Sequence, residues 1–124
     1  MPAEPPLIAV VGGTGLLGAA LARRWVTAGL PVLIGSRDAA RAAQSAAALA
    51  RELGRPVEGA SNRDVAARSG IIVVTVPYAA QADTLSDIRS AASGKIVIDT
   101  TVPLVPPKVM RVQLPPEGSA ALRA

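Results

Sequence analysis

The chain contains no cysteine and no histidine among its 124 residues. The absence of cysteine excludes disulfide bonds, thiolate catalysis and cysteine metal ligands. The absence of histidine excludes imidazole acid–base chemistry, histidine-based triads and most zinc sites. We therefore predict no metal site, and we assign no catalytic side chain from the sequence.

Aromatic residues are also scarce. They make up 2% of the chain, with one Trp, one Tyr and no Phe, although 50% of the residues are hydrophobic. The core must then be built from Ala, Val, Ile and Leu. A protein with so few aromatic side chains and no basic run cannot form a stacking platform for bases, so we predict that it does not bind nucleic acid.

Long apolar runs are missing as well. No stretch approaches the roughly 20 apolar residues that span a bilayer, so we predict no membrane association. Residues 1–6 read Met-Pro-Ala-Glu-Pro-Pro, which is acidic and proline-rich, unlike a secretory signal peptide. We expect this segment to be disordered and the protein to be cytoplasmic.

The charge has a moderate positive excess. Thirteen Lys and Arg residues stand against nine Asp and Glu residues, for a net charge of +4, and most of the cations are Arg. Arg makes planar, bidentate contacts with phosphate and carboxylate groups. An anionic small molecule is therefore the expected partner.

Strand and helix patterns alternate along the chain, which has the length of one domain. Strands are predicted at residues 7–11, 32–34, 71–76 and 96–98, with a weak one near Val57, and helices at residues 16–28, 39–53 and 79–92, with entries at Ser61 and near Ser119. The run at 96–98 is apolar throughout and is expected to be buried. This alternation predicts a single-domain α/β fold, a Rossmann-type doubly wound parallel sheet whose ligand site lies at the carboxyl ends of the strands.

A glycine motif follows the first predicted strand. Gly13, Gly15 and Gly18 have the G-x-G-x-x-G spacing and lie between a buried strand and an amphipathic helix. In this context we expect Gly13 to make the tight turn, Gly15 to let a pyrophosphate approach the backbone, and Gly18 to let the helix pack closely. The motif predicts a dinucleotide site; the alternative is a purely structural turn.

The end of the second strand distinguishes NADP from NAD. An acidic residue there holds a ribose hydroxyl, whereas this chain has Ser36 and then Arg37, with Arg41 one helical turn later. A hydroxyl and two guanidinium groups suit a 2′-phosphate, so NADP is predicted. In the alternative, Ser36 caps a helix and both Arg side chains are solvated, while Asp38 is expected at the helix start.

Two further strand ends carry polar or aromatic residues. Pro77 and Tyr78 close the strand at 71–76, and Tyr78 either packs on the nicotinamide end of the nucleotide or is simply half-buried. Asp99 follows the strand at 96–98. A single Asp after a strand more often hydrogen-bonds a loop than acts as a base.

Taken together, these residues resemble the NADPH-dependent coenzyme F420 (deazaflavin) reductases. The resemblance rests on residues 11–18, 35–37, 74–78 and 102–106, which occur in that family's order and extend over most of the chain. The glycine block and the Ser-Arg pair are shared with other NADP-binding proteins, including pyrroline-5-carboxylate reductases. The Val-Pro-Leu-Val-Pro loop at 102–106 is the more specific element.

The resemblance implies hydride exchange between NADP(H) and coenzyme F420. Such a reaction needs little side-chain chemistry, because the protein mainly holds two redox rings together. The implied cofactor-binding residues are Thr14, Gly15, Leu16 and Leu17 at the pyrophosphate, Ser36, Arg37 and Arg41 at the 2′-phosphate, and Tyr78 and Val102 at the ribose–nicotinamide end.

The C-terminus departs from this family. Its members continue into a smaller domain that completes the deazaflavin pocket and a homodimer, whereas this chain ends at Ala124, inside the last predicted helix. We expect the chain to be the NADP-binding domain of a longer protein, with residues 101–118 as a proline-rich connection, and to turn over poorly alone. Two alternatives remain: a reductase of another small substrate such as a cyclic imine, and a non-catalytic NADPH-binding module.

Overall fold

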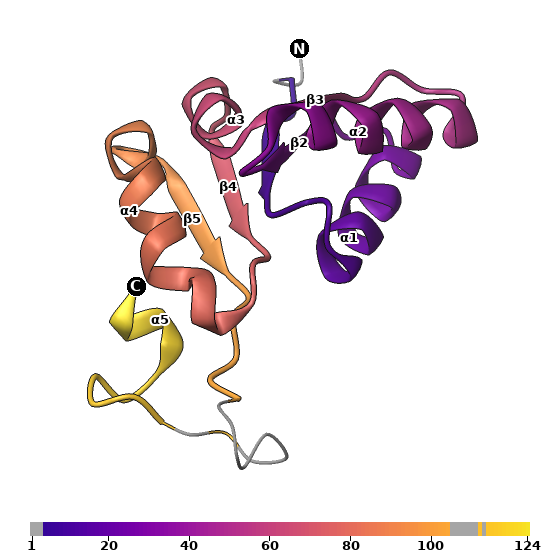
Figure 1. The fold of residues 1–124 in the computed structure, drawn as a ribbon. Coiled ribbons are helices and arrows are strands. Elements are labelled where there is room, and N and C mark those ends of the chain that lie inside the picture. The colour runs from indigo at the N-terminus through magenta and orange to yellow at the C-terminus, as the bar shows by residue number, and fades with distance from the viewer. Residues whose placement is uncertain (1–3, 105–111, 113) are drawn as a thin grey trace.

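The fold is a five-stranded parallel sheet with helices on both faces (Figure 1). The computed structural model describes residues 4–104, 112 and 114–124. The strands are β1 (Ile8–Val11), β2 (Val32–Ser36), β3 (Glu58–Ser61), β4 (Ile71–Val74) and β5 (Ile96–Asp99). The helices are α1 (Leu16–Thr27), α2 (Ala39–Leu53), α3 (Asn62–Arg68), α4 (Gln81–Ala92) and α5 (Ala120–Arg123), with a 3₁₀ turn η1 (Tyr78–Ala80) before α4.

The strand order β3-β2-β1-β4-β5 confirms the predicted doubly wound topology. The chain runs outward from β1 through β2 to β3, then crosses back to β4 and β5. Right-handed crossovers place the helices of these two halves on opposite faces of the sheet. The winding reverses between β1 and β4, so the crevice at their carboxyl ends is the expected ligand site.

Two hydrophobic clusters hold the layers together. On one face, Ile8 and Val10 pack with residues of α1 and α2. On the other, Ala9 and Val11 pack with residues of α3 and α4. Because successive side chains of a strand point to opposite faces, a strand buried on both sides is apolar throughout, as the sequence indicates for β1.

Local signals set the helix ends. The predicted helix 39–53 is confirmed with the same bounds: the Asp38 carboxylate accepts hydrogen bonds from the N–H groups of Ala40 (3.0 Å) and Arg41 (3.3 Å), and Gly54 ends the helix in the left-handed conformation. Ser61 caps α3 by accepting from the N–H of Asp64. Such caps satisfy the free N–H groups of a first turn.

The remaining strand and helix predictions are confirmed with small shifts. β3 begins at Glu58, just after Val57, and α5 begins after its cap, Ser119. β4 ends at Val74, two residues earlier than predicted. Residues 4–6, at the start of the description, lie outside helices and strands. Within the predicted connection 101–118, residues 105–111 and 113 lie outside the described residues.

The fifth strand is exposed, so the expectation of a buried strand at residues 96–98 is wrong. Ile96, Val97 and Ile98 are 61%, 42% and 47% exposed. β5 lies at the edge of the sheet and, among the described residues, pairs with β4 alone. An apolar run alone does not reveal whether its strand is central or at an edge.

No helix in the described part of the chain is long and apolar enough to cross a membrane.

Lys95 ties the start of β5 to the end of α3. Its Nζ donates to the carbonyl oxygens of Ala66 (2.5 Å) and Ala67 (2.8 Å). Because cations stabilise helix C-termini, we expect Lys95→Met to lower the free energy of unfolding by about 1 kcal/mol. Urea denaturation measures this loss.

The matched control for this prediction is Arg89→Met. Arg89 is an exposed cation on α4 whose side chain has no hydrogen-bond acceptor in the described residues. We expect its replacement to leave the urea midpoint nearly unchanged. Equal losses for the two variants would contradict the role assigned to Lys95.

Candidate functional site

A cavity of about 380 Å³ lies at the carboxyl ends of β1, β2 and β4. It is lined by the glycine turn, the start of α2 and the segment after β4, namely Gly12, Thr14, Gly15, Ser36, Arg37, Asp38, Arg41, Asn62, Thr75, Val76, Pro77, Ala80 and Thr84. This is the edge at which doubly wound folds bind ligands. A hollow of about 300 Å³ adjoins it and shares Arg37, Asn62, Ala80 and Thr84.

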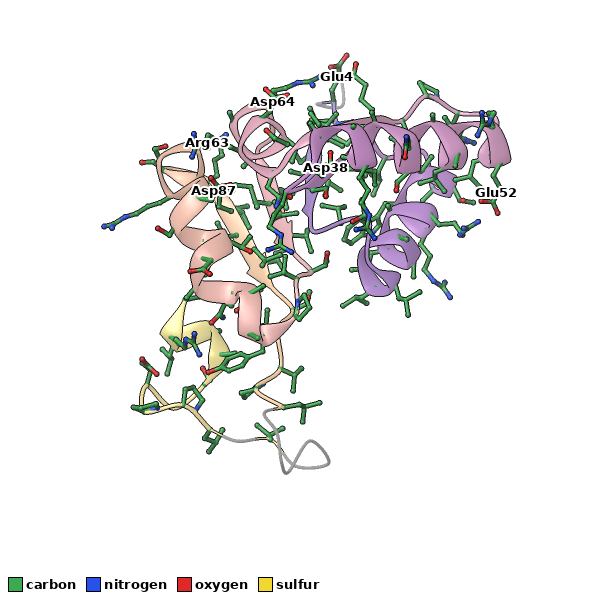
Figure 2. The ribbon with its side chains drawn as sticks, viewed as in Figure 1. Glu4, Asp38, Glu52, Arg63, Asp64 and Asp87 are labelled. Carbon is green, nitrogen blue, oxygen red and sulfur yellow. The ribbon has the colours of Figure 1, made fainter. Side chains whose placement is uncertain are left out.

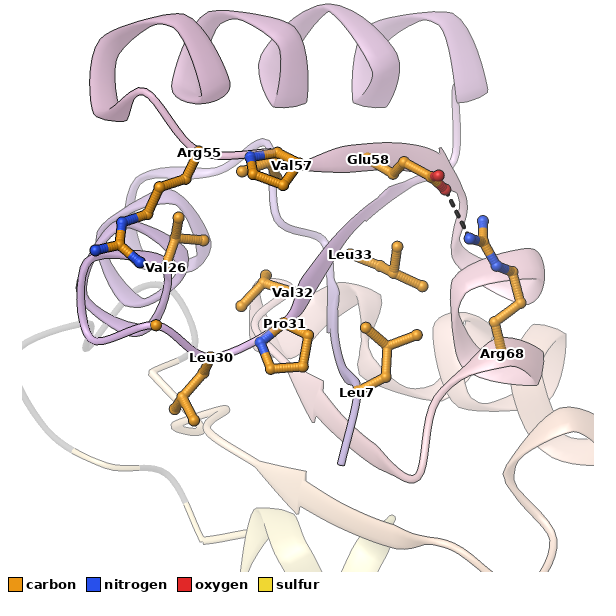
Figure 3. A pocket seen from close by; sticks show the side chains of 12 residues that line it. Leu7, Val26, Leu30, Pro31, Val32, Leu33, Arg55, Val57, Glu58 and Arg68 are labelled. Atoms are coloured by element: carbon orange, nitrogen blue, oxygen red, sulfur yellow. Dashed lines mark hydrogen bonds and ion pairs between the residues drawn. The ribbon is translucent and has the colours of Figure 1, made fainter. Parts of the chain in front are cut away.

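A further hollow, of about 470 Å³, lies at the opposite edge, where the strands begin (Figure 3). Its walls are mainly apolar, with Leu7 and Pro31 among them. The Glu58 carboxylate and the Arg68 guanidinium form an ion pair across it at 2.6 Å. That hydrogen bond and the charge of Glu58 raise the pKa of Arg68, so its charge is paired with Glu58, while Arg55 also borders this hollow. The cavity at the carboxyl ends adds the N-terminus of a helix to its Arg residues and is the better candidate for an anionic ligand.

The glycine turn differs from its prediction in one detail. Gly12, not Gly13, adopts the left-handed conformation, with φ of +77°, so the expected role of Gly13 is wrong by one residue. A Cβ on Gly12 would also lie 2.6 Å from Val76 Cγ1. Gly13 is needed for space, because its Cβ would lie 2.8 Å from the Val10 carbonyl oxygen.

The other two glycines have the predicted surroundings. A Cβ on Gly18 would lie 2.7 Å from both Gly13 Cα and Thr75 Oγ1, so α1 packs closely on the turn only because Gly18 has no side chain. A Cβ on Gly15 would meet only Gly12 O, at 3.5 Å, and its φ of −78° suits any residue. Gly15 borders the cavity, so its missing side chain leaves room there.

The start of α1 carries uncompensated positive potential. Its cap residue Gly15 has no side chain, and the first turn contains no acidic residue. The N–H groups of Gly12, Gly13 and Gly15 are already used, by Asn62, Gly35 and Gly12 respectively.

Those of Thr14, Leu16 and Leu17 have no acceptor among the described residues. Free N–H groups at a helix N-terminus form an anion-binding site. The side chains of Leu16 and Leu17 are exposed and do not line the cavity, so these residues offer only their backbone.

The end of β2 adds cations to the same cavity. Arg37 and Arg41 line its wall, and no carboxylate in the described residues pairs with either guanidinium group. The nearby Asp38 is the cap of α2 (Figure 2). Ser36 is buried, and its Oγ accepts from the N–H of Asp38 at 3.2 Å, which leaves its hydroxyl hydrogen to donate. Asp38, rather than Ser36, caps the helix.

Tyr78 and Val102 do not line this cavity. The Tyr78 hydroxyl forms a hydrogen bond with the Arg123 guanidinium, whose carbon lies 4.6 Å from the centre of the ring. Val102 follows β5 and is 49% exposed. The structure therefore does not bring these two residues together with the phosphate-facing set.

Asp99 hydrogen-bonds a loop, which was the favoured interpretation of the sequence. Its carboxylate accepts from the N–H of Thr101 (3.0 Å) and from Nε2 of Gln81 (2.6 Å). It is not a lining residue of the cavity. Among the residues described, no three Asp or Glu side chains cluster as metal ligands would. The cavity can therefore bind and orient an anion, and among the described residues the one carboxylate that lines it, Asp38, caps α2.

Sequence reasoning missed Asn62, Thr75 and Thr84. Asn62 is 3% exposed and accepts a hydrogen bond from the glycine turn at Gly12. Its place at the carboxyl end of a strand, which it shares with Ser36, was an available signal. Thr75 Oγ1 donates to the Val11 carbonyl oxygen at 2.8 Å. Thr84 lies on α4, and only the folding of α4 against the other strand ends brings it here.

Comparison with known proteins gives consistent results. The family described as coenzyme F420-dependent NADP oxidoreductase matches residues 7–103. The F420-dependent NADP reductase of Methanothermobacter thermautotrophicus is 46% identical over 123 residues, covering 94% of this chain and 53% of that protein. The enzyme of the same name from Methanocaldococcus jannaschii is 33% identical over 122 residues, covering 92% and 54%.

Solved structures share the fold. A crystal structure from Arthrobacter sp. FB24, described as an F420-dependent NADP reductase, superimposes with a TM-score of 0.77 at 28% identity, covering 95% of this chain and 56% of that one. Pyrroline carboxylate reductase from Plasmodium falciparum has a TM-score of 0.61 at 20% identity, covering 87% and 38%, which supports the fold alone. The chain spans about half the length of the curated relatives it matches.

Proposed function

The chain belongs to the coenzyme F420-dependent NADP oxidoreductase family, and on that premise we propose that it binds NADP(H) for hydride exchange with coenzyme F420. The observation that carries the proposal is the joining of two anion-binding features in one cavity. The N-terminus of α1 borders the same space as Arg37 and Arg41, neither of which pairs with a carboxylate in the described part of the chain. A dinucleotide with an additional phosphate is the ligand that uses both.

The pyrophosphate fits the start of α1. We assign its oxygens to the N–H groups of Thr14, Leu16 and Leu17, which have no acceptor in the part of the chain that the structure describes. Gly15 leaves room for their approach, since a side chain there would enter the cavity rather than the protein. Gly13 supports this site because its missing side chain lets the turn pack against the carbonyl oxygen of Val10.

The 2′-phosphate fits the end of β2. We assign it to the guanidinium groups of Arg37 and Arg41 and to the hydroxyl of Ser36. The carboxylate of Asp38, which also borders this cavity, is engaged at the start of α2, where it accepts two N–H groups. Arg favours such contacts because its planar fork matches phosphate oxygens. Selection of NADP over NAD follows.

The reaction itself requires mainly orientation. When bound, the nicotinamide supplies or accepts the hydride, and the deazaflavin is its partner. The residues described here hold the nucleotide by its phosphates, at the edge of the sheet where β1 and β4 end. The assignment of Tyr78 and Val102 to the ribose–nicotinamide end stays a prediction from the resemblance.

Absorbance of the deazaflavin tests this function. We expect NADPH plus the complete natural polypeptide to bleach oxidised coenzyme F420, and NADH to do so far more slowly. No change in absorbance with either nucleotide would contradict the proposal. Replacing coenzyme F420 by a cyclic imine is the control that identifies a reductase of another substrate, and calorimetry with NADPH identifies a module that binds without turnover.

A further inference from the structure

Asn62 joins the glycine turn to the third strand across the site. It is the first residue of α3, directly after β3, and its Oδ1 accepts the N–H of Gly12 at 3.2 Å. Only 3% of the residue is exposed. This buried side chain therefore links the end of β3 to the turn after β1, which lies 50 positions away in the sequence.

The surrounding backbone is shaped to admit this side chain. A Cβ on Gly35 would lie 2.7 Å from Asn62 Oδ1, so the amide lies directly over Gly35. Gly35 in turn accepts the N–H of Gly13 at 2.8 Å. The turn is therefore held at two successive N–H groups, one by β2 and one by Asn62.

The amide nitrogen of Asn62 is unused. Oδ1 is identified as the oxygen because its partner Gly12 N–H is a donor, which leaves Nδ2 with two hydrogens. Nδ2 has no acceptor among the residues described. Asn62 lines both the main cavity and the adjoining hollow. Among the described residues, Nδ2 is not one of the fully buried polar atoms that lack a partner, so it is open to these spaces, and a ligand that enters them can accept a hydrogen bond from it.

We propose that Asn62 is a positioning residue of the nucleotide site, in which Oδ1 holds the Gly12 turn and Nδ2 donates to an oxygen on the adenosine side of the dinucleotide. The adenosine side is indicated because both spaces bordered by Asn62 are also bordered by Arg37. This inference rests on the proposed function, and it adds a contact outside the glycine motif and the Ser-Arg pair.

Two variants separate the two atoms of the amide. Asn62→Ala removes both contacts; we expect NADPH affinity to fall about tenfold or more, and the Gly12 amide hydrogen to exchange faster in the nucleotide-free chain. Asn62→Asp keeps an oxygen for Gly12 N–H but replaces the donor by negative charge near Arg37. We expect normal exchange at Gly12, NADPH affinity at least tenfold weaker, and a smaller loss for NADH.

Ser61→Ala is the matched control. It removes the cap of the same helix, where Ser61 Oγ accepts from Asp64 N–H at 3.1 Å, and Ser61 does not line either cavity. We expect its melting temperature to fall by a few degrees, with nucleotide affinity and Gly12 exchange unchanged. A purely structural role of Asn62 would make its variants behave like this control.

Hydrogen exchange at Gly12 and the relative losses of NADPH and NADH affinity decide between the proposal and its contradiction. Faster Gly12 exchange in Asn62→Ala, together with a larger loss for NADPH than for NADH in Asn62→Asp, supports the proposal. Unchanged exchange in the alanine variant, or equal losses in the aspartate variant, overturns it. If the wild-type chain binds neither nucleotide, the proposed function fails, and Gly12 exchange measured without nucleotide still decides the positioning role.

Discussion

Replacing Arg37 by alanine is expected to weaken NADPH binding about 10- to 150-fold and to leave NADH binding nearly unchanged. A charge-assisted, forked contact with a phosphate contributes roughly 1.5–3 kcal/mol, and each 1.4 kcal/mol is a tenfold change in affinity. Arg37 lines the cavity, and its guanidinium has no carboxylate partner in the described residues. Its removal therefore leaves no carboxylate of the described residues without an ion-pair partner.

Titration calorimetry with both nucleotides measures this effect. The matched control is Arg51→Ala, because Arg51 lies in the last turn of α2, the helix that follows Arg37, and does not line the cavity. We expect that control to bind both nucleotides like the wild type. Equal losses for NADPH and NADH in Arg37→Ala would refute the assignment of the 2′-phosphate to this residue.

The largest effect on stability is expected from Gly59→Ala, a change of one methyl group in β3. A Cβ there would lie 2.1 Å from the carbonyl oxygen of Ala42 and 2.4 Å from its carbonyl carbon. These are backbone atoms in the first turn of α2, so the start of the helix would have to move away from the strand. Overpacking of this kind costs about 3 kcal/mol, and the melting temperature should fall by about 10 °C.

The control for this prediction is Gly70→Ala. A Cβ on Gly70 would meet Pro6 Cβ at 3.6 Å, an ordinary contact, and its φ is not positive. Urea denaturation should therefore show little change in this variant. Because α2 begins beside the cavity with Asp38 and Arg41, we also expect Gly59→Ala to weaken NADPH binding. If Gly59→Ala were as stable as Gly70→Ala, α2 could shift on β3 at little cost, and the prediction would be wrong.

The sequence is enough to single out Arg37, whereas the importance of Gly59 can be recognised only from a tertiary contact. Arg37 is visible in the sequence, because it follows a strand and a Ser. Gly59 is not: nothing in the residues around it marks a close approach, and the need for glycine comes from Ala42, 17 positions earlier. Helix-to-strand contact of this kind exists only after the crossover brings α2 back over the sheet.

The same division explains the errors in the site. Local spacing predicted a tight turn in the glycine motif, but the structure gives the positive φ to Gly12, against Val76 just after β4, while Gly13 lies against Val10 of β1. Likewise, the apolar pattern of residues 96–98 predicted a strand correctly and its burial wrongly. Burial depends on the neighbours of β5, and those are set by strand order.

The sequence by itself determined the elements of this protein and the chemistry it can offer. The lack of Cys and His excludes thiol and imidazole chemistry. The glycine motif, Ser36 and Arg37 lie at the ends of strands that can be predicted from their apolar runs, because local sequence patterns encode local structure. The tertiary structure alone decided which side chains meet. It brought Asn62 to Gly12, placed Tyr78 beside Arg123, and set the start of α1 at the same cavity as Arg37 and Arg41. Contacts between distant residues depend on how the strands pair and cross over, and that information is not present in any single segment of the chain.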